Sequence, residues 1–129
     1  MYFGTGVSNG VYTNDFWKFD PSTEVWTKLL DLDKKKSYAI ARSNAVSFSL
    51  NNYGYIVSGV QNGSSSSVWQ YNPIKDTWME MTGFEGSSRQ DAISFSNGNK
   101  AFVGLGKTGN LYLDDLDEFF PDMKYNKED

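Results

Sequence analysis

Serine alternates with apolar side chains in two stretches of the chain that begin 47 residues apart. Residues 42–49 read RSNAVSFS and residues 89–96 read RQDAISFS, with identity at five of eight positions. Because successive side chains of a strand point to opposite faces, this pattern predicts a half-buried β-strand in each stretch. An apolar run ending in glycine follows each one, at residues 55–59 and 102–106, and the chain opens on the same element at residues 2–6. These runs predict a second, more deeply buried strand in three repeated units.

A second repeated segment combines aromatic residues with a proline. It reads FWKFDPSTEVW at residues 16–26, VWQYNPIKDTW at 68–78 and LDEFFPDMKYN at 116–126. In the first two copies the residue before proline is Asp or Asn, whose side chain can hydrogen-bond to the following backbone, so the segment predicts a turn between two strands. A period of about fifty residues with recurring glycine and aromatic positions indicates a propeller-type repeat. The residues that we assign to the structural repeat are Gly6, Gly59, Gly106, Trp17, Trp69, Trp26, Trp78, Pro21, Pro73 and Pro121.

These units predict an all-β chain built from four-stranded antiparallel blades, since no window of the sequence shows sustained helical periodicity. We expect strands two to four of a partial blade in residues 1–30, and a complete blade with a lengthened leading loop in residues 31–82. Residues 83–123 are expected to hold strands one to three of another partial blade, and residues 124–129 an acidic C-terminal tail. The total is about two and a half blades, whereas a closed propeller has about four to eight.

The repeated motifs resemble those of bacterial kelch-repeat proteins of the galactose-oxidase-like superfamily. The similarity is carried by Tyr2–Gly6, Asn14–Trp17 and Asp20–Trp26. It implies a β-propeller with a binding or scaffolding role, favours the bacterial periplasm or cell surface, and implies that this chain is the C-terminal part of a longer propeller. The last unit departs from the family pattern, because Asp117 and Asn126 stand where the two tryptophans would be. In kelch relatives such a blade is commonly completed by a strand from the N-terminus of the chain.

Composition excludes several classes of function. The net charge is −4; residues 111–129 hold seven acidic residues against two lysines, a net of −5, which leaves +1 for the remainder. The only basic run, Lys34–Lys36, is more typical of a solvated turn than of a nucleic-acid footprint. The chain has no Cys and no His, so it lacks thiolate metal ligands, cysteine nucleophiles and the commonest general base. We expect no metal and no cofactor. No apolar run reaches the length of about twenty residues that spans a bilayer, and no signal peptide precedes the first strand-like residues.

The candidate ligand-binding residues lie just ahead of the two innermost strands. Arg42 and Arg89 begin these stretches, and in kelch propellers the innermost strand lines the central channel. Relatives that bind acidic peptides or sialic-acid sugars use arginines near the channel mouth, and the guanidinium fork suits a carboxylate. The alternative, a structural arginine that holds carbonyls of a neighbouring blade, is equally supported by the sequence. The residues expected to share this rim are Ser43, Asn44, Gln90 and Asp91.

Other conspicuous side chains favour structural interpretations. The four tryptophans recur at fixed repeat positions, so we expect packing between blades rather than platforms for sugar stacking. Tyr12, Tyr38 and Tyr53 fall outside the repeat and are better candidates for ligand contact, although packing is favoured for them too. The acidic run at residues 114–118 lacks the spacing of a calcium loop, and we interpret it as a solvated edge that deters strand pairing.

The sequence favours a non-catalytic kelch propeller that recognises a glycan or a protein partner through its channel-face loops. The alternative is a kelch-type carbohydrate enzyme, such as a sialic-acid epimerase or mutarotase, whose catalytic residues would lie mostly in blades outside this chain. In that case the base would be a carboxylate such as Asp91, because histidine is absent. Unpaired blade edges also predict that the chain associates with itself when it is expressed alone.

Overall fold

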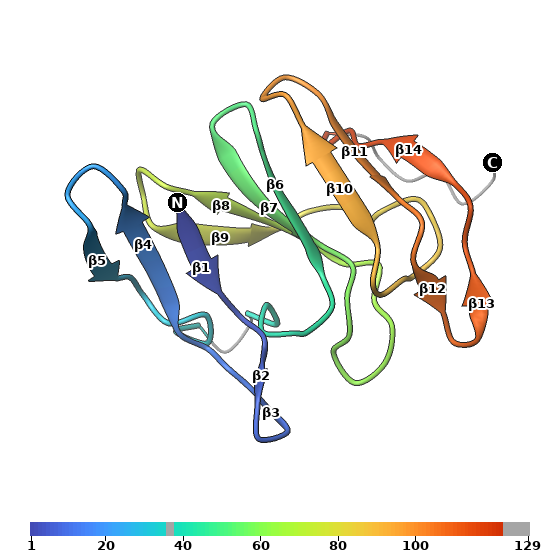
Figure 1. The fold of residues 1–129 in the computed structure, drawn as a ribbon, viewed down its shortest axis with the longest axis horizontal. Coiled ribbons are helices and arrows are strands. Elements are labelled where there is room, and N and C mark those ends of the chain that lie inside the picture. Colours follow the sequence, from blue (N-terminus) through green and yellow to red (C-terminus); the bar gives the residue numbers. More distant parts are fainter. Residues whose placement is uncertain (36–37, 123–129) are drawn as a thin grey trace. The chain divides into compact units, whose positions relative to one another are not determined.

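The computed structural model describes residues 1–35 and 38–122, and within these ranges it contains fourteen β-strands and no helix. The strands form antiparallel sheets of two, three or four members (Figure 1). The predicted fold class, all-β with partial propeller blades, is therefore confirmed. The predicted acidic tail, residues 124–129, lies outside the described residues, as does Asn126. In the described part, no helix is long and apolar enough to cross a membrane.

The chain divides into two compact units, Met1–Ser43 and Asn44–Asp129. The first unit ends at Ser43, so it includes the beginning of the second predicted blade, residues 31–82. The amide of Leu32 donates to the carbonyl of Asn14 (2.7 Å), and the amide of Gly6 donates to the carbonyl of Arg42 (2.8 Å). The blade limits at residues 30 and 82 stay predictions.

The first unit contains a three-stranded sheet with the order β1-β4-β5. Its strands are β1 (Tyr2–Gly4), β4 (Phe16–Asp20) and β5 (Val25–Lys28). The turn between β4 and β5 begins at Asp20, whose carboxylate accepts a hydrogen bond from the amide of Ser22 (2.9 Å) on the far side of Pro21. This is the local side-chain-to-backbone bond that the sequence pattern predicts for this turn.

The second unit contains one four-stranded and one three-stranded sheet. The first has the order β6-β7-β8-β9, formed by β6 (Val46–Leu50), β7 (Tyr53–Val57), β8 (Val68–Asn72) and β9 (Thr77–Glu80). The second has the order β10-β11-β14, formed by β10 (Ile93–Ser96), β11 (Ala101–Gly104) and β14 (Leu116–Glu118). With the sheet of the first unit, the three sheets hold three, four and three strands, as expected for one complete and two partial blades.

Two short hairpins were not anticipated. They are β2 (Val7–Ser8) with β3 (Val11–Tyr12), and β12 (Lys107–Thr108) with β13 (Leu111–Tyr112). Each lies between the second and third strands of its blade, and the complete blade has an isolated bridge between Val60 and Ser64 at the same place. The first turn places Asn9 and Gly10 at φ of 51° and 77°, the left-handed geometry that a two-residue hairpin requires.

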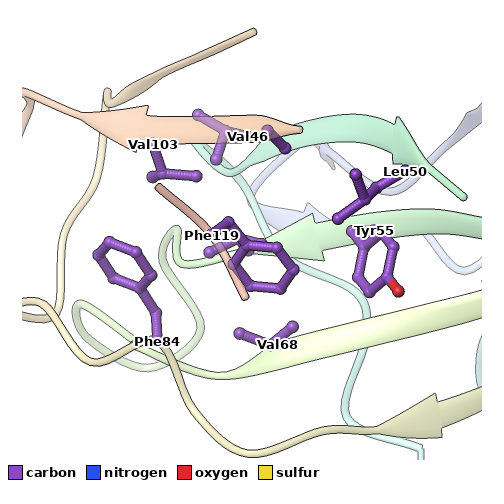
Figure 2. Close-up of a cluster of buried hydrophobic side chains, with 9 residues drawn as sticks. Val46, Leu50, Tyr55, Val68, Phe84, Val103 and Phe119 are labelled. Carbon is purple, nitrogen blue, oxygen red and sulfur yellow. The ribbon is translucent and has the colours of Figure 1, made fainter. Parts of the chain in front are cut away.

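The core of the second unit lies between its two sheets (Figure 2). Val57, Val68 and Val103 are fully buried there. Phe119, which follows β14, packs edge-on against Phe48 and Tyr55 of the four-stranded sheet, with ring centroids 5.1 and 5.2 Å away. Burying these side chains removes apolar surface from water at both sheets at once, so the two blades stabilise each other.

Candidate binding face on the inner strands

The first strands of the two blades in the second unit lie side by side. Ser94 donates its hydroxyl to the carbonyl of Ser47 (3.2 Å), and Ser96 donates to the carbonyl of Ser49. A parallel bridge joins Leu50 to Gly98 at the end of these strands. The serines that alternate with apolar residues in the sequence thus form a ladder between β6 and β10, while the apolar side chains of β6 face the core.

A polar rim precedes these two strands. The side-chain amide of Asn44 donates to Oδ1 of Asp91 (2.6 Å), and the ammonium of Lys107 lies 3.3 Å from Oδ2 of the same carboxylate. Gln90 and Lys107 exchange two backbone hydrogen bonds of 2.9 Å, which places the lysine beside the rim. Asn44 and Asp91 hold equivalent left-handed conformations, with φ of 55° and 56°, which Asn and Asp tolerate better than most residues. Repeat-equivalent residues therefore meet at this rim.

The charge of the rim is set by its hydrogen bonds. The pKa of Asp91 lies below its ordinary value mainly because of the hydrogen bond from Asn44; desolvation, the next largest effect, opposes it, and the hydrogen bond and charge of Lys107 lower the pKa further. Asp91 is exposed to solvent and is ionised at neutral pH. The carboxylate is thus held in place by two donors and is still open to further donors from a ligand.

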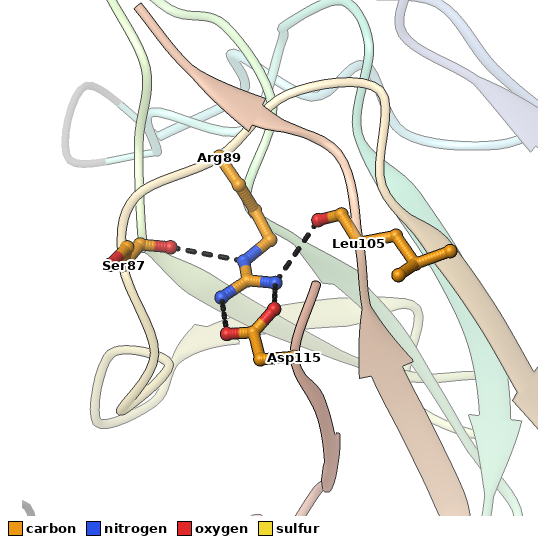
Figure 3. A network of polar contacts seen from close by, with 4 residues as sticks. All are labelled: Ser87, Arg89, Leu105 and Asp115. Atoms are coloured by element: carbon orange, nitrogen blue, oxygen red, sulfur yellow. Dashed lines mark hydrogen bonds and ion pairs between the residues drawn. The ribbon is translucent and has the colours of Figure 1, made fainter. Parts of the chain in front are cut away.

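Arg89 lies beneath this rim and not on it. Its side chain is fully buried, and its guanidinium forms two 2.6 Å hydrogen bonds with the carboxylate of Asp115 (Figure 3). The same side chain donates to the carbonyls of Leu105 and Ser87, each at 3.1 Å, and lies over the ring of Phe84 at 5.0 Å. The guanidinium fork is therefore occupied by its own chain. In turn it lowers the pKa of Asp115.

Arg42 is buried to the same degree in the first unit. Its guanidinium donates to the carbonyls of Ile40 (2.8 Å) and Ala39 (2.9 Å), and its backbone bonds to Thr5 and Gly6. Ser43, half-buried, is the last residue of that unit. A ligand-binding role for the two arginines stays a prediction, and the burial of their side chains does not favour it. The alternative was an arginine that holds backbone carbonyls, and both arginines make contacts of that kind.

The aromatic residues divide between core and surface. Trp69 and Trp78 are buried, and Trp78 packs on Tyr71 with centroids 4.9 Å apart. Trp17 is half-buried, and Trp26 packs on Phe19 (4.7 Å) with 53% of its surface exposed. The tyrosines outside the repeat are half-buried at Tyr12 and Tyr38, while Tyr53 is exposed.

Two residues at these sites were missed by the sequence analysis. For Asp115 the interpretation of the acidic run as a solvated edge was wrong, because its carboxylate binds a buried guanidinium. The signal that could have found it is its position: Asp115 directly precedes β14 as Asp15 directly precedes β4. Lys107 gave no such signal, since it is the backbone pairing of Lys107 with Gln90, a residue distant in sequence, that places its side chain beside Asp91. Among residues 1–35 and 38–122, no group of three or more acidic side chains gathers as metal ligands would.

Comparison with known proteins agrees with this architecture. Residues 41–84 match the family model described as the kelch motif. A solved structure described as "Structure of YjhT" superposes with a TM-score of 0.67 at 20% sequence identity; the match covers 84% of this chain and 32% of the other, so this chain spans about a third of that protein's length. No curated protein matches the chain in sequence. The kelch motif therefore coincides with the four-stranded sheet of the second unit, and the fold of the chain is similar to that of the solved structure.

Proposed function

We propose that this chain contributes blades to a non-catalytic kelch propeller whose inner face binds a polar ligand, a glycan or a protein partner. The observation that carries the proposal is the rim of Asn44, Asp91 and Lys107, which gathers an amide, a carboxylate and an ammonium at the leading ends of two adjacent inner strands. Hydroxyl-rich and peptide ligands are both recognised by such mixed sets of donors and acceptors.

The rim is also held in place before any ligand arrives. Asp91 is restrained from two sides, by the amide of Asn44 and by the ammonium of Lys107. A restrained side chain loses less conformational entropy on binding than a mobile one, which favours affinity. The serine ladder between β6 and β10 restrains the backbone beneath the rim in the same way.

The direction of the pKa shift favours binding over catalysis at this carboxylate. A general base works best when its pKa lies near the operating pH, and enzymes usually raise the pKa of a carboxylate for that purpose. The pKa of Asp91 is lowered instead, because its charged form is stabilised by Asn44 and Lys107. A carboxylate of this kind accepts hydrogen bonds well and accepts a proton poorly.

A glycan and peptide array probed with the protein tests the proposal. We expect bound spots whose signal is lost in Asp91→Ala and is retained in the charge-matched control Asp117→Ala, which alters an exposed side chain on β14. Melting temperatures of both variants verify that the fold is intact. An array without bound spots, combined with interconversion of sialic-acid anomers or epimers by the protein, would overturn the binding role in favour of the carbohydrate enzyme.

A further inference from the structure

Asparagine is followed by glycine at three places in the chain, residues 9–10, 62–63 and 97–98. Asparagine is a thermolabile residue, and a following glycine increases its reactivity, because glycine has no Cβ to shield its amide nitrogen and lets the backbone rotate. All three asparagines are exposed, and a Cβ on any of the three glycines would meet no described atom within 4 Å. The three pairs are thus alike in sequence and in open space, and they differ in hydrogen bonding.

Asn97 is held at both groups that would react. Its Oδ1 accepts hydrogen bonds from the amides of Asn99 (3.0 Å) and Lys100 (2.9 Å), which fix the side-chain carbonyl. The amide of Gly98, whose nitrogen would be the nucleophile, donates to Oγ of Ser96 (3.1 Å). Because these bonds must be given up before the nitrogen can reach the side chain, they slow any reaction between the two groups.

Asn62 lies in the loop between β7 and β8 and lacks such restraints. Within residues 1–35 and 38–122, neither its side chain nor the amide of Gly63 has a hydrogen-bond partner. The loop is closed at its base by the bridge between Val60 and Ser64. One local bond, from the amide of Gln61 to the carbonyl of Gly63 (3.0 Å), spans the pair and leaves both reacting groups open.

Asn9 is intermediate between these two. In the described part of the chain its side chain and the amide of Gly10 are also without a partner. The pair, however, forms the whole turn between β2 and β3, and the flanking residues Ser8 and Val11 are paired with each other. A two-residue turn requires its left-handed geometry at both positions, so rotation at Asn9 opens the hairpin.

We propose that Asn62 is a site of spontaneous modification, at which the folded chain converts asparagine to aspartate and isoaspartate faster than at Asn9 or Asn97. The backbone nitrogen of Gly63 loses its proton to solvent and bonds to Cγ of Asn62. The bond between Cγ and Nδ2 breaks, and the leaving NH₂ group takes a proton back from solvent and departs as ammonia. One water molecule then opens the cyclic imide at either of its carbonyl carbons, so that one water is consumed and one ammonia released.

The modification changes a loop that is tied to the candidate binding face. At the base of the loop the amide of Gly59 donates to the carbonyl of Arg89 (2.8 Å), and the amide of Arg89 donates to the carbonyl of Ser65 (3.3 Å). Arg89 directly precedes the rim residues Gln90 and Asp91. Either product adds a negative charge to this loop, and isoaspartate also lengthens its backbone by one methylene. The reaction itself needs no ligand at the rim.

Peptide mapping by mass spectrometry measures the rate at each asparagine, after the full chain has been incubated in a mildly alkaline buffer that favours loss of the amide proton. We expect Asn62 to be converted about tenfold or more faster than Asn97, because the loss of one or two hydrogen bonds changes a rate by that order. The same incubation in denaturing urea removes the bonds and is expected to bring the three rates together. Equal rates at Asn62 and Asn97 in the folded chain, or the same ranking in urea, would overturn the proposal.

A pair of serine variants tests the cause of the protection. Ser96→Ala removes the acceptor of the Gly98 amide, and it is expected to speed the conversion of Asn97 by about two- to tenfold. Ser94→Ala is the matched control, because it removes a bond of the serine ladder and leaves the Gly98 amide as it is. Melting temperatures verify that both variants are folded. An unchanged rate at Asn97 in folded Ser96→Ala would show that hydrogen bonding does not set the ranking.

Discussion

At the scale of single residues, the feature that matters most for stability is the buried guanidinium of Arg89. Arg89 is 0% exposed, and such a charge is tolerated only when its hydrogen bonds and counter-charge are complete. We predict that Arg89→Met destabilises the second unit by about 3–5 kcal/mol, because it leaves the Asp115 carboxylate without its partner and opens the packing around Phe84. We expect a loss near the lower end of this range, because the side chain of Asp115 is partly exposed to water. Urea unfolding measures the loss.

A double-mutant cycle separates the ion pair from the packing. Asp115→Leu alone strands a buried guanidinium, whereas Arg89→Met with Asp115→Leu removes both charges, so the double variant is expected to be more stable than the sum of the single losses predicts. Arg89→Lys is expected to recover little, because an ammonium cannot form both bonds to the carboxylate. Strict additivity in the cycle would contradict a direct pair.

The same carboxylate makes stability depend on pH. Since Arg89 lowers the pKa of Asp115 in the folded protein, the unfolded chain binds its proton first as the pH falls. The contribution of Asp115 is fully present above the ordinary pKa of about 3.8 and is lost as the pH falls through the folded pKa. We predict that the free energy of unfolding declines below about pH 4, and less steeply in Asp115→Asn than in the control Asp117→Asn. Denaturant titrations across pH 2–7 test this; equal slopes would contradict it.

At the scale of elements, the glycine that follows β11 lies against the segment that leads into β10, the first strand of the same sheet. Gly106 has φ of 85°, and a Cβ there would meet the carbonyl oxygen of Gln90 at 2.5 Å and the backbone of Ala92. Gly109, in the β12–β13 turn, also has positive φ (56°) but open space around the Cβ position. We predict that Gly109→Ala costs about 1–2 kcal/mol from its backbone conformation alone, and that Gly106→Ala costs clearly more. Thermal melts of the two variants measure the loss of stability: Gly109→Ala has only the strain of a positive φ, and Gly106→Ala has in addition the steric clash with the backbone.

The elements also show what sequence could and could not predict. The strands β6, β7 and β8 were predictable from the alternation of polar and apolar residues and from apolar runs. These patterns lie within each strand, because its buried side chains pack in the core. The β2–β3 and β12–β13 hairpins escaped prediction since each strand has two residues, too few for a periodic signal, although Asn9-Gly10 is a turn signature. The ion pair of Arg89 and Asp115 joins residues 26 positions apart, and no pattern within a single strand predicts such a pair.

At the scale of the whole molecule, the last blade leaves apolar surface uncovered. In the four-stranded blade, the stacked pair Phe48–Tyr55 is covered by Phe119. The equivalent pair in the last blade, Phe95–Phe102, is stacked in the same way with centroids 5.1 Å apart, yet Phe95 is 50% exposed and its neighbour Ile93 46%. Adjacent apolar side chains on an exposed strand favour association with other chains.

We therefore predict that the 129-residue chain self-associates in solution, and that Phe95→Lys weakens this association. Tyr112→Lys is the matched control, because Tyr112 is 80% exposed and lies on the β12–β13 hairpin, outside the sheet that contains Phe95. Light scattering over a range of concentrations measures the mean mass, which is expected to rise with concentration for the unmodified chain and the control but not for Phe95→Lys. A concentration-independent monomer with a sharp melt would show that the exposed face of the last blade is stable without a neighbour.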